Sequence, residues 1–79
     1  MNESVIQSYV KRKFFVSTVY RESSAMVYPP PKYYETIIWE WDSTTRKSGK
    51  MLSIIDSGRT IKQALKSHFG ICANIFKKD

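Results

Sequence analysis

The residue types that catalyse reactions or bind metals are few in this sequence of 79 residues. His68 is the only histidine and Cys72 the only cysteine, and their spacing places them on the same side of a helix. Such a pair could supply two ligands to zinc, but a structural zinc site needs four. A histidine on the apolar side of a helix is more often a buried, hydrogen-bonded residue than a general base, and we expect this of His68. The sequence therefore predicts no metal site and no cofactor.

Two carboxylates, Glu40 and Asp42, would share one face of a strand. Paired carboxylates can perform acid–base catalysis. Where a strand ends at a turn, however, they more often form a solvated acidic edge, here facing Arg46 or Lys50. No glycine-rich phosphate-binding pattern is present. We therefore expect a protein that is not an enzyme.

Composition describes a small basic domain. Lysine and arginine number 13 against 7 acidic residues, giving a formal charge of +6. The apolar fraction of 42% and the charged fraction of 25% are ordinary for a globular protein. One cysteine excludes an intramolecular disulfide, and no apolar run approaches the length of a membrane span. We expect a single small α+β domain over residues 1–79, located in the cytoplasm.

Three strands are expected to position the candidate residues. Lys13–Arg21 is rich in aromatic and β-branched residues, and Tyr33–Asp42 alternates strongly. In the second of these, the predicted core face carries Ile37, Trp39 and Trp41.

A third strand, Lys50–Asp56, returns after a turn at Ser43–Gly49. Together with the preceding strand it forms a hairpin with a basic tip.

The C-terminal segment predicts a helix. Thr60 followed by Gln63 is a capping-box pattern. An apolar arc follows at helical spacing, and Gly70 within it could mark a kink or an early end. The arc comprises Ile61, Leu65, His68, Phe69, Cys72, Ile75 and Phe76.

The first ten residues leave two alternatives open. Asn2 could cap a short helix in which Val5 and Ile6 precede Tyr9 and Val10 by four residues. Alternatively, the segment runs as extended chain into the first strand. We favour the short helix. The predicted fold is thus a three-stranded antiparallel meander packed against a C-terminal helix, with a short N-terminal helix.

Two groups of residues are candidates for binding. Tyrosine and arginine are favoured anchors in protein interfaces. The first group, predicted to bind a partner, is Tyr28, Tyr33, Tyr34, Arg46, Lys47 and Lys50. Cations can also contact phosphates, and exposed tyrosines can stack on bases. The second group, predicted to bind nucleic acid, is Arg59, Lys62, Lys66 and Lys77.

Phe14–Glu22 and Tyr33–Asp42 resemble segments of small phage and prophage accessory proteins, in which a proline-containing loop separates two such strands. The resemblance implies expression in a bacterial host cytoplasm. It also implies the kind of stoichiometric binding seen in anti-CRISPR proteins and other host-factor inhibitors. It implies no particular site residue.

Two functions follow from these observations. The first is non-enzymatic binding and modulation of a host protein or ribonucleoprotein. The alternative is direct binding of RNA or DNA by a small regulator. A homodimer joined through an exposed strand edge is compatible with both.

Overall fold

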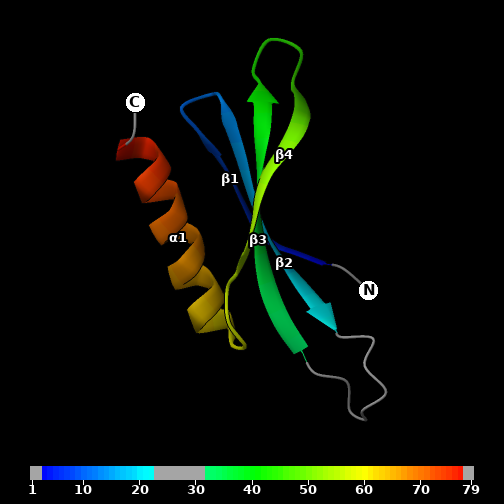
Figure 1. The fold of residues 1–79 in the computed structure, drawn as a ribbon, viewed down its shortest axis with the longest axis vertical. Coiled ribbons are helices and arrows are strands. Elements are labelled where there is room, and N and C mark those ends of the chain that lie inside the picture. Colours follow the sequence, from blue (N-terminus) through cyan, green and yellow to red (C-terminus); the bar gives the residue numbers. More distant parts are fainter. Residues whose placement is uncertain (1–2, 23–31, 78–79) are drawn as a thin grey trace.

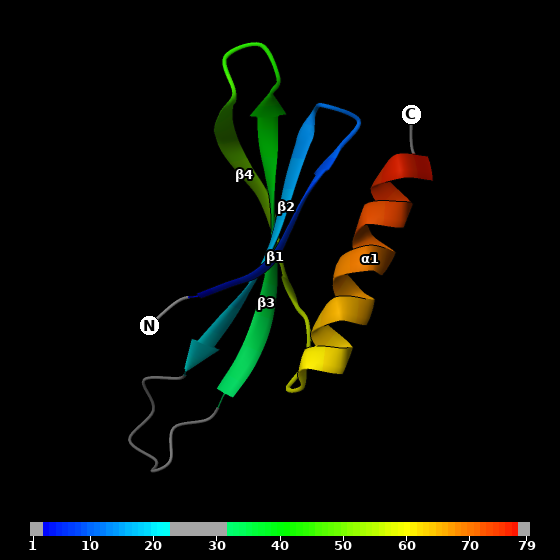
Figure 2. The same cartoon turned by 180° about the vertical axis from the view of Figure 1, so that it is seen from behind.

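The computed structural model describes residues 3–22 and 32–77, which form one antiparallel sheet and one helix (Figure 1 and Figure 2). The strands are β1 (Glu3–Val10), β2 (Phe14–Glu22), β3 (Lys32–Asp42) and β4 (Lys47–Asp56), and helix α1 (Ile61–Lys77) follows them. The strand order is β1-β2-β3-β4, with each strand antiparallel to the next. The α+β class is therefore confirmed, but the sheet has four strands rather than three.

The N-terminal segment forms strand β1, so the predicted helix is wrong there. A helix of about two turns forms few hydrogen bonds for the residues that it orders, whereas β1 pairs with β2 from Glu3 to Val10, with one register shift between Ser4 and Ile6. The turn between them has positive φ at Lys11 (54°) and Arg12 (60°), and the Lys13 N–H donates to the Val10 carbonyl (3.1 Å). These are the features of a type I′ turn, whose twist suits a hairpin.

The other predicted elements are present with small shifts at their ends. The second hairpin turn is shorter than expected, because β4 begins at Lys47 and not at Lys50. The capping box at the start of α1 is confirmed: the Gln63 N–H donates to Thr60 Oγ1 (3.1 Å), and the Thr60 N–H donates to Gln63 Oε1 (3.3 Å). The helix continues through Gly70 to its last residue.

Helix α1 covers one face of the sheet, and it is not the face that carries the tryptophans. His68 of α1 bonds to Thr18, and Thr18 bonds across the strands to Thr36. Because side chains alternate along a strand, Ile37 and Trp39 point to the other face. Ile37 is buried as expected, but the helix does not supply that burial. We call the face without the helix the open face.

The interface between the helix and the sheet contains a connected set of polar side chains. In the described residues only four apolar side chains are buried, namely Val10, Val16, Ile37 and Ala64. A chain of side-chain hydrogen bonds 2.6 to 2.9 Å long runs between the two layers instead. In order, its members are Ser8, His68, Thr18, Thr36, Ser57 and Ser67.

Both ring nitrogens of His68 take part in this chain, Nδ1 with Thr18 (2.8 Å) and Nε2 with Ser8 (2.8 Å). A neutral imidazole has one N–H donor and one acceptor nitrogen, and a hydroxyl group can act as the partner of either. A neutral histidine therefore fits both bonds.

Both hairpin turns lie at the same end of the molecule, and α1 also ends on that side (Figure 1 and Figure 2). The loop from β3 to β4 and the turn from β1 to β2 thus border one region. Within residues 3–22 and 32–77, no helix is long and apolar enough to cross a membrane.

Candidate functional site

Three aromatic side chains cluster on the open face beside the hairpin turns. The ring centroids of Tyr9 and Trp41 are 4.7 Å apart, and Phe15 lies 5.2 Å from Tyr9 and 5.9 Å from Trp41. Tyr9 is paired with Phe15 and Phe15 with Trp39. Trp41 lies two residues after Trp39, on the same face of β3 and diagonal to Phe15. The Tyr9 side chain is 59% exposed. The cluster is therefore an accessible aromatic surface and not a closed core.

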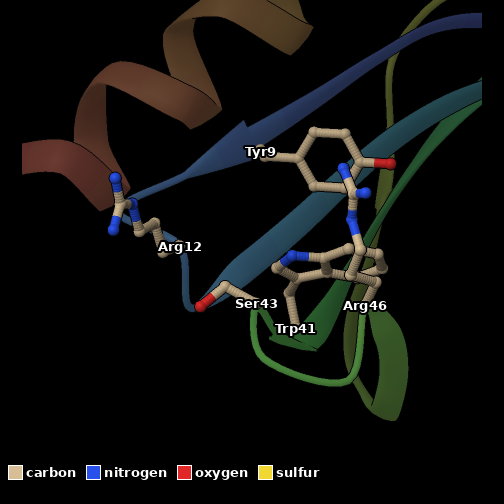
Figure 3. A pocket seen from close by; sticks show the side chains of 5 residues that line it. All are labelled: Tyr9, Arg12, Trp41, Ser43 and Arg46. Carbon is tan, nitrogen blue, oxygen red and sulfur yellow. The ribbon is translucent and has the colours of Figure 1, made fainter.

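An open hollow of about 740 Å³ lies against this cluster. Figure 3 shows its lining: Arg46 lies beside the rings of Tyr9 and Trp41, whereas the Arg12 side chain stands apart from them and points toward the helix in this view. Ser43 completes the lining. The hollow is thus lined by two aromatic residues, from β1 and β3, and by two arginines, from the β1–β2 and β3–β4 turns.

Both arginines have backbone conformations that residues other than glycine rarely adopt. The φ angle is 60° at Arg12 and 58° at Arg46, a region that costs an L-residue about 1–2 kcal/mol. The β1–β2 turn fixes Arg12, and a hydrogen bond from the Arg46 N–H to the Asp42 carbonyl (2.7 Å) fixes Arg46. Strained backbone of this kind concentrates at functional sites. Lys11 in the same turn as Arg12 also has a positive φ (54°), as the geometry of that turn requires.

The carboxylates near the hollow are engaged with the backbone. Asp42 Oδ1 accepts the N–H groups of Thr44 (2.9 Å) and Thr45 (3.2 Å), and these bonds lower the pKa of Asp42. Glu40 Oε1 accepts the N–H of Lys50 (3.2 Å). Both side chains stabilise the β3–β4 hairpin, which presents Arg46.

The predicted partner-binding residues do not form one site. Tyr33 and Tyr34 lie near the start of β3, whereas Arg46 and Lys47 follow its end. At about 3.3 Å per residue, these two groups are roughly 30 Å apart. Tyr28 lies outside the described residues.

The two tyrosines make contacts of their own away from the hollow. The Tyr34 ring packs against Tyr20 at a centroid distance of 5.5 Å. The guanidinium of Arg59 lies 5.9 Å from the centre of the Tyr33 ring, and Arg59 also pairs with Asp56 (3.6 Å). The predicted nucleic-acid residues Arg59, Lys62, Lys66 and Lys77 are all exposed, but no aromatic cluster lies among them in the described part of the chain.

His68 is fully buried and bonded through both ring nitrogens, which confirms the expectation of a core histidine. Burial lowers its pKa below the ordinary histidine value. Burial also raises the pKa of the Cys72 thiol, against a smaller opposing effect of the Ser8 hydroxyl. A raised pKa keeps Cys72 in its less nucleophilic thiol form near neutral pH. Nowhere in residues 3–22 and 32–77 do three or more metal-ligating side chains gather.

Tyr9, Arg12 and Trp41 are not among the binding residues predicted from the sequence. The sequence places Tyr9 in the predicted N-terminal helix and Trp41 on the predicted core face, and Arg12 lies just before the predicted strand Lys13–Arg21. One local signal for Arg12 exists: three successive cations at residues 11–13 separate two segments of good strand-forming residues. Such a polar interruption is typical of a hairpin turn.

Comparison of the chain with protein-family models, curated proteins and solved structures finds no match.

Proposed function

We propose that the protein is a non-enzymatic module that binds single-stranded nucleic acid on its open face. Bases stack on Tyr9 and Trp41, and phosphates contact Arg12 and Arg46. The observation that carries the proposal is the placement of two guanidinium groups around one accessible aromatic cluster. Stacking of bases on aromatic rings, combined with cationic contacts to the backbone, is the usual chemistry of such sites.

The chemistry favours a single strand over a duplex. Bases in a duplex are already stacked on one another, so their faces are not available to Tyr9 or Trp41. The hollow has space for a base against these rings. The formal charge of +6 provides general attraction to phosphate.

A direct test is the quenching of tryptophan fluorescence on titration with oligonucleotides of about 12 nucleotides. We expect poly(dT) or poly(U) strands to quench the emission and a blunt duplex to bind more weakly. Between about 50 and 200 mM salt the affinity should fall steeply, and loss of one arginine contact should reduce the logarithmic slope by about 0.7. Lys62→Ala is the matched control, because Lys62 is exposed on α1 away from the hollow. Affinity that does not depend on salt, or on Arg12 and Arg46, would overturn the proposal.

A second candidate function is binding to a host protein or ribonucleoprotein, as the resemblance to phage accessory proteins suggests. The observation that favours it is the exposure of Met51 (44%) and Ile54 (49%) on β4, because aliphatic side chains contribute more to a protein interface than to base stacking. A pull-down with the tagged chain, with and without nuclease, separates the two functions. A discrete protein band that survives nuclease and moderate salt supports this second candidate.

A further inference from the structure

A second hollow, of about 400 Å³, lies between strand β1 and the helix. Residues 8–11 line it from β1 and the turn that follows, and Cys72, Ala73, Phe76 and Lys77 line it from α1. In the part of the chain that the structure describes, β1 is the outermost strand of the sheet on this side. We call this second hollow the edge hollow.

The edge hollow combines an exposed aromatic ring with cations. The ammonium of Lys11 lies 5.6 Å from the centre of the Phe76 ring, and Phe76 is 67% exposed with Lys11 in place. Lys77 also lines the hollow, and among the described residues that line it none is acidic. The charges therefore suit an anionic occupant, and the exposed ring suits one that carries flat aromatic groups.

Tyr9 connects the edge hollow to the hollow on the open face, because it lines both. Its side chain is 59% exposed, so a bound chain that lies against Trp41 can continue past Tyr9 and around the edge strand. The β1–β2 turn supplies cations at this point. It is drawn between the β3–β4 loop and the C-terminal end of α1 in Figure 2, and the Arg12 side chain points toward the helix in Figure 3.

We propose that the edge hollow is a second base-binding site for the same single strand of nucleic acid. One base stacks on Phe76, and the adjacent phosphates contact Lys11 and Lys77. The strand runs from Trp41 past Tyr9 to Phe76. This second site rests on the proposed function, because it extends the path of the strand bound on the open face.

Two linked contacts explain why one small domain would use both hollows. Once a base has bound in one hollow, binding of the same strand in the other is intramolecular and raises the affinity without further contacts. Among the cations of α1 that the sequence predicts to bind nucleic acid, Lys77 lines the edge hollow, whereas Lys62 and Lys66 line neither hollow.

The test compares Phe76→Ala with Phe69→Ala. Both remove an exposed phenylalanine from α1. The two residues are seven positions apart, hence on nearly the same side of the helix and about 10 Å apart along its axis, and Phe69 does not line the edge hollow. Anisotropy of labelled oligo(dT) of about 12 nucleotides, the long strand, measures the affinity. We expect Phe76→Ala to raise the dissociation constant about 5- to 150-fold at fixed salt, and Phe69→Ala to leave it unchanged.

The salt dependence tests the phosphate contact separately. Lys77→Ala should reduce the logarithmic salt slope for the long strand by about 0.7, whereas Lys66→Ala, the matched control on the same helix, should not. Circular dichroism confirms that all four variants remain folded. Equal effects of Phe76→Ala and Phe69→Ala, or of Lys77→Ala and Lys66→Ala, overturn the second site.

A short strand separates failure of the second site from failure of the proposed function. Both tryptophans lie on β3, so quenching of their fluorescence by oligo(dT) of about three nucleotides reports on the open face. Phe76→Ala should leave this quenching unchanged. If Trp41→Ala weakens binding of the long strand and Phe76→Ala does not, the second site is overturned while the proposed function stands. If the long strand does not bind at all, both are overturned.

Cys72 provides an independent measurement on the unmodified protein, because it is the only cysteine of the chain and lines the edge hollow. Saturation with the long strand should slow its alkylation severalfold. An unchanged rate overturns the second site. Slowing by polyglutamate but not by the long strand also overturns it, and would assign the edge hollow to an acidic protein segment.

Discussion

The rings of Tyr9 and Trp41 lie 4.7 Å apart although their strands are not neighbours. Adjacent strands are about 4.8 Å apart, so the backbones of β1 and β3 are separated by roughly 10 Å. Both side chains extend over β2, where the Phe15 ring contacts the rings of Tyr9 and Trp41. The register of three strands therefore builds this aromatic surface, and shifting one strand by a single residue would remove it.

Replacing Trp41 should weaken binding to single strands. If a base stacks on the indole, Trp41→Ala should raise the dissociation constant about 5- to 150-fold at fixed salt, and Trp41→Phe should retain most of the affinity. Anisotropy of a labelled oligonucleotide measures the change. Tyr34→Ala is the matched control, since Tyr34 is an aromatic residue at the other end of β3. Equal losses from Trp41→Ala and Tyr34→Ala would contradict a site at the hairpin end.

Replacing Arg46 by glycine should separate stability from binding. Glycine adopts positive φ freely, so Arg46→Gly should raise the free energy of unfolding by up to about 1 kcal/mol while weakening nucleic-acid binding. Lys47→Gly is the control. Lys47 begins β4 and is not among the positive-φ residues, so glycine there should destabilise by about 0.5–1 kcal/mol. Urea unfolding measures both variants. If Arg46→Gly loses as much stability as Lys47→Gly, the strain at Arg46 has no energetic consequence.

The buried His68 should make stability depend on pH. Burial lowers its pKa in the folded state, so the unfolded chain takes up a proton first as the pH falls. The free energy of unfolding should then be unaffected above about pH 6.5 and fall below it, by at most about 1.4 kcal/mol per pH unit, until the pH reaches the folded pKa.

Urea titrations at a series of pH values between about 7.5 and 5 check this expectation. His68→Gln should flatten the dependence even where it lowers stability at every pH. Asp42 also has a lowered pKa, but its contribution to the free energy of unfolding is lost only as the pH falls below the ordinary aspartate pKa near 3.9. The two groups therefore act in separate pH windows. An equally steep fall in His68→Gln would assign the dependence to another group.

Features encoded by nearby residues were predictable from the sequence. The capping box at Thr60 and Gln63 depends on side chains three residues apart, and it was found without the structure. Strand β3 was recognised almost to its ends because its alternation is strong.

Features that depend on distant residues were not predictable. Strand β1 exists because it pairs with β2 across the Lys11–Arg12 turn, and its own sequence suits a short helix equally well. Both faces of β3 carry apolar residues, so its sequence does not tell which face α1 covers. Contacts between distant residues, such as the buried hydrogen bond between Thr18 and His68, which are 50 residues apart, distinguish the two faces. The positions of Tyr9 and Arg12 depend on strand β1 and the turn that follows it. A helix predicted in place of β1 therefore does not bring these residues to the candidate site.

Alanine at two glycines should shift stability in opposite directions. Gly58 has a φ of 95°, and a Cβ there would lie 2.6 Å from Gln63 Oε1 and 2.8 Å from Gln63 Cβ. That oxygen accepts the N–H groups of Arg59 (2.8 Å) and Thr60 (3.3 Å). Gly58→Ala must therefore both strain the backbone and displace the side chain that caps α1. We expect it to lower the free energy of unfolding by about 1–3 kcal/mol.

Gly70 lies within α1, and a Cβ there would meet no atom within 4 Å. Gly70→Ala should raise the free energy of unfolding by about 1 kcal/mol, because alanine loses less backbone entropy in a helix. Urea unfolding of both variants at one protein concentration measures the two changes in the free energy of unfolding. A lower free energy of unfolding in Gly70→Ala would mean that the helix is interrupted at that residue. An unchanged free energy of unfolding in Gly58→Ala would mean that the cap at Gln63 does not hold α1 in place.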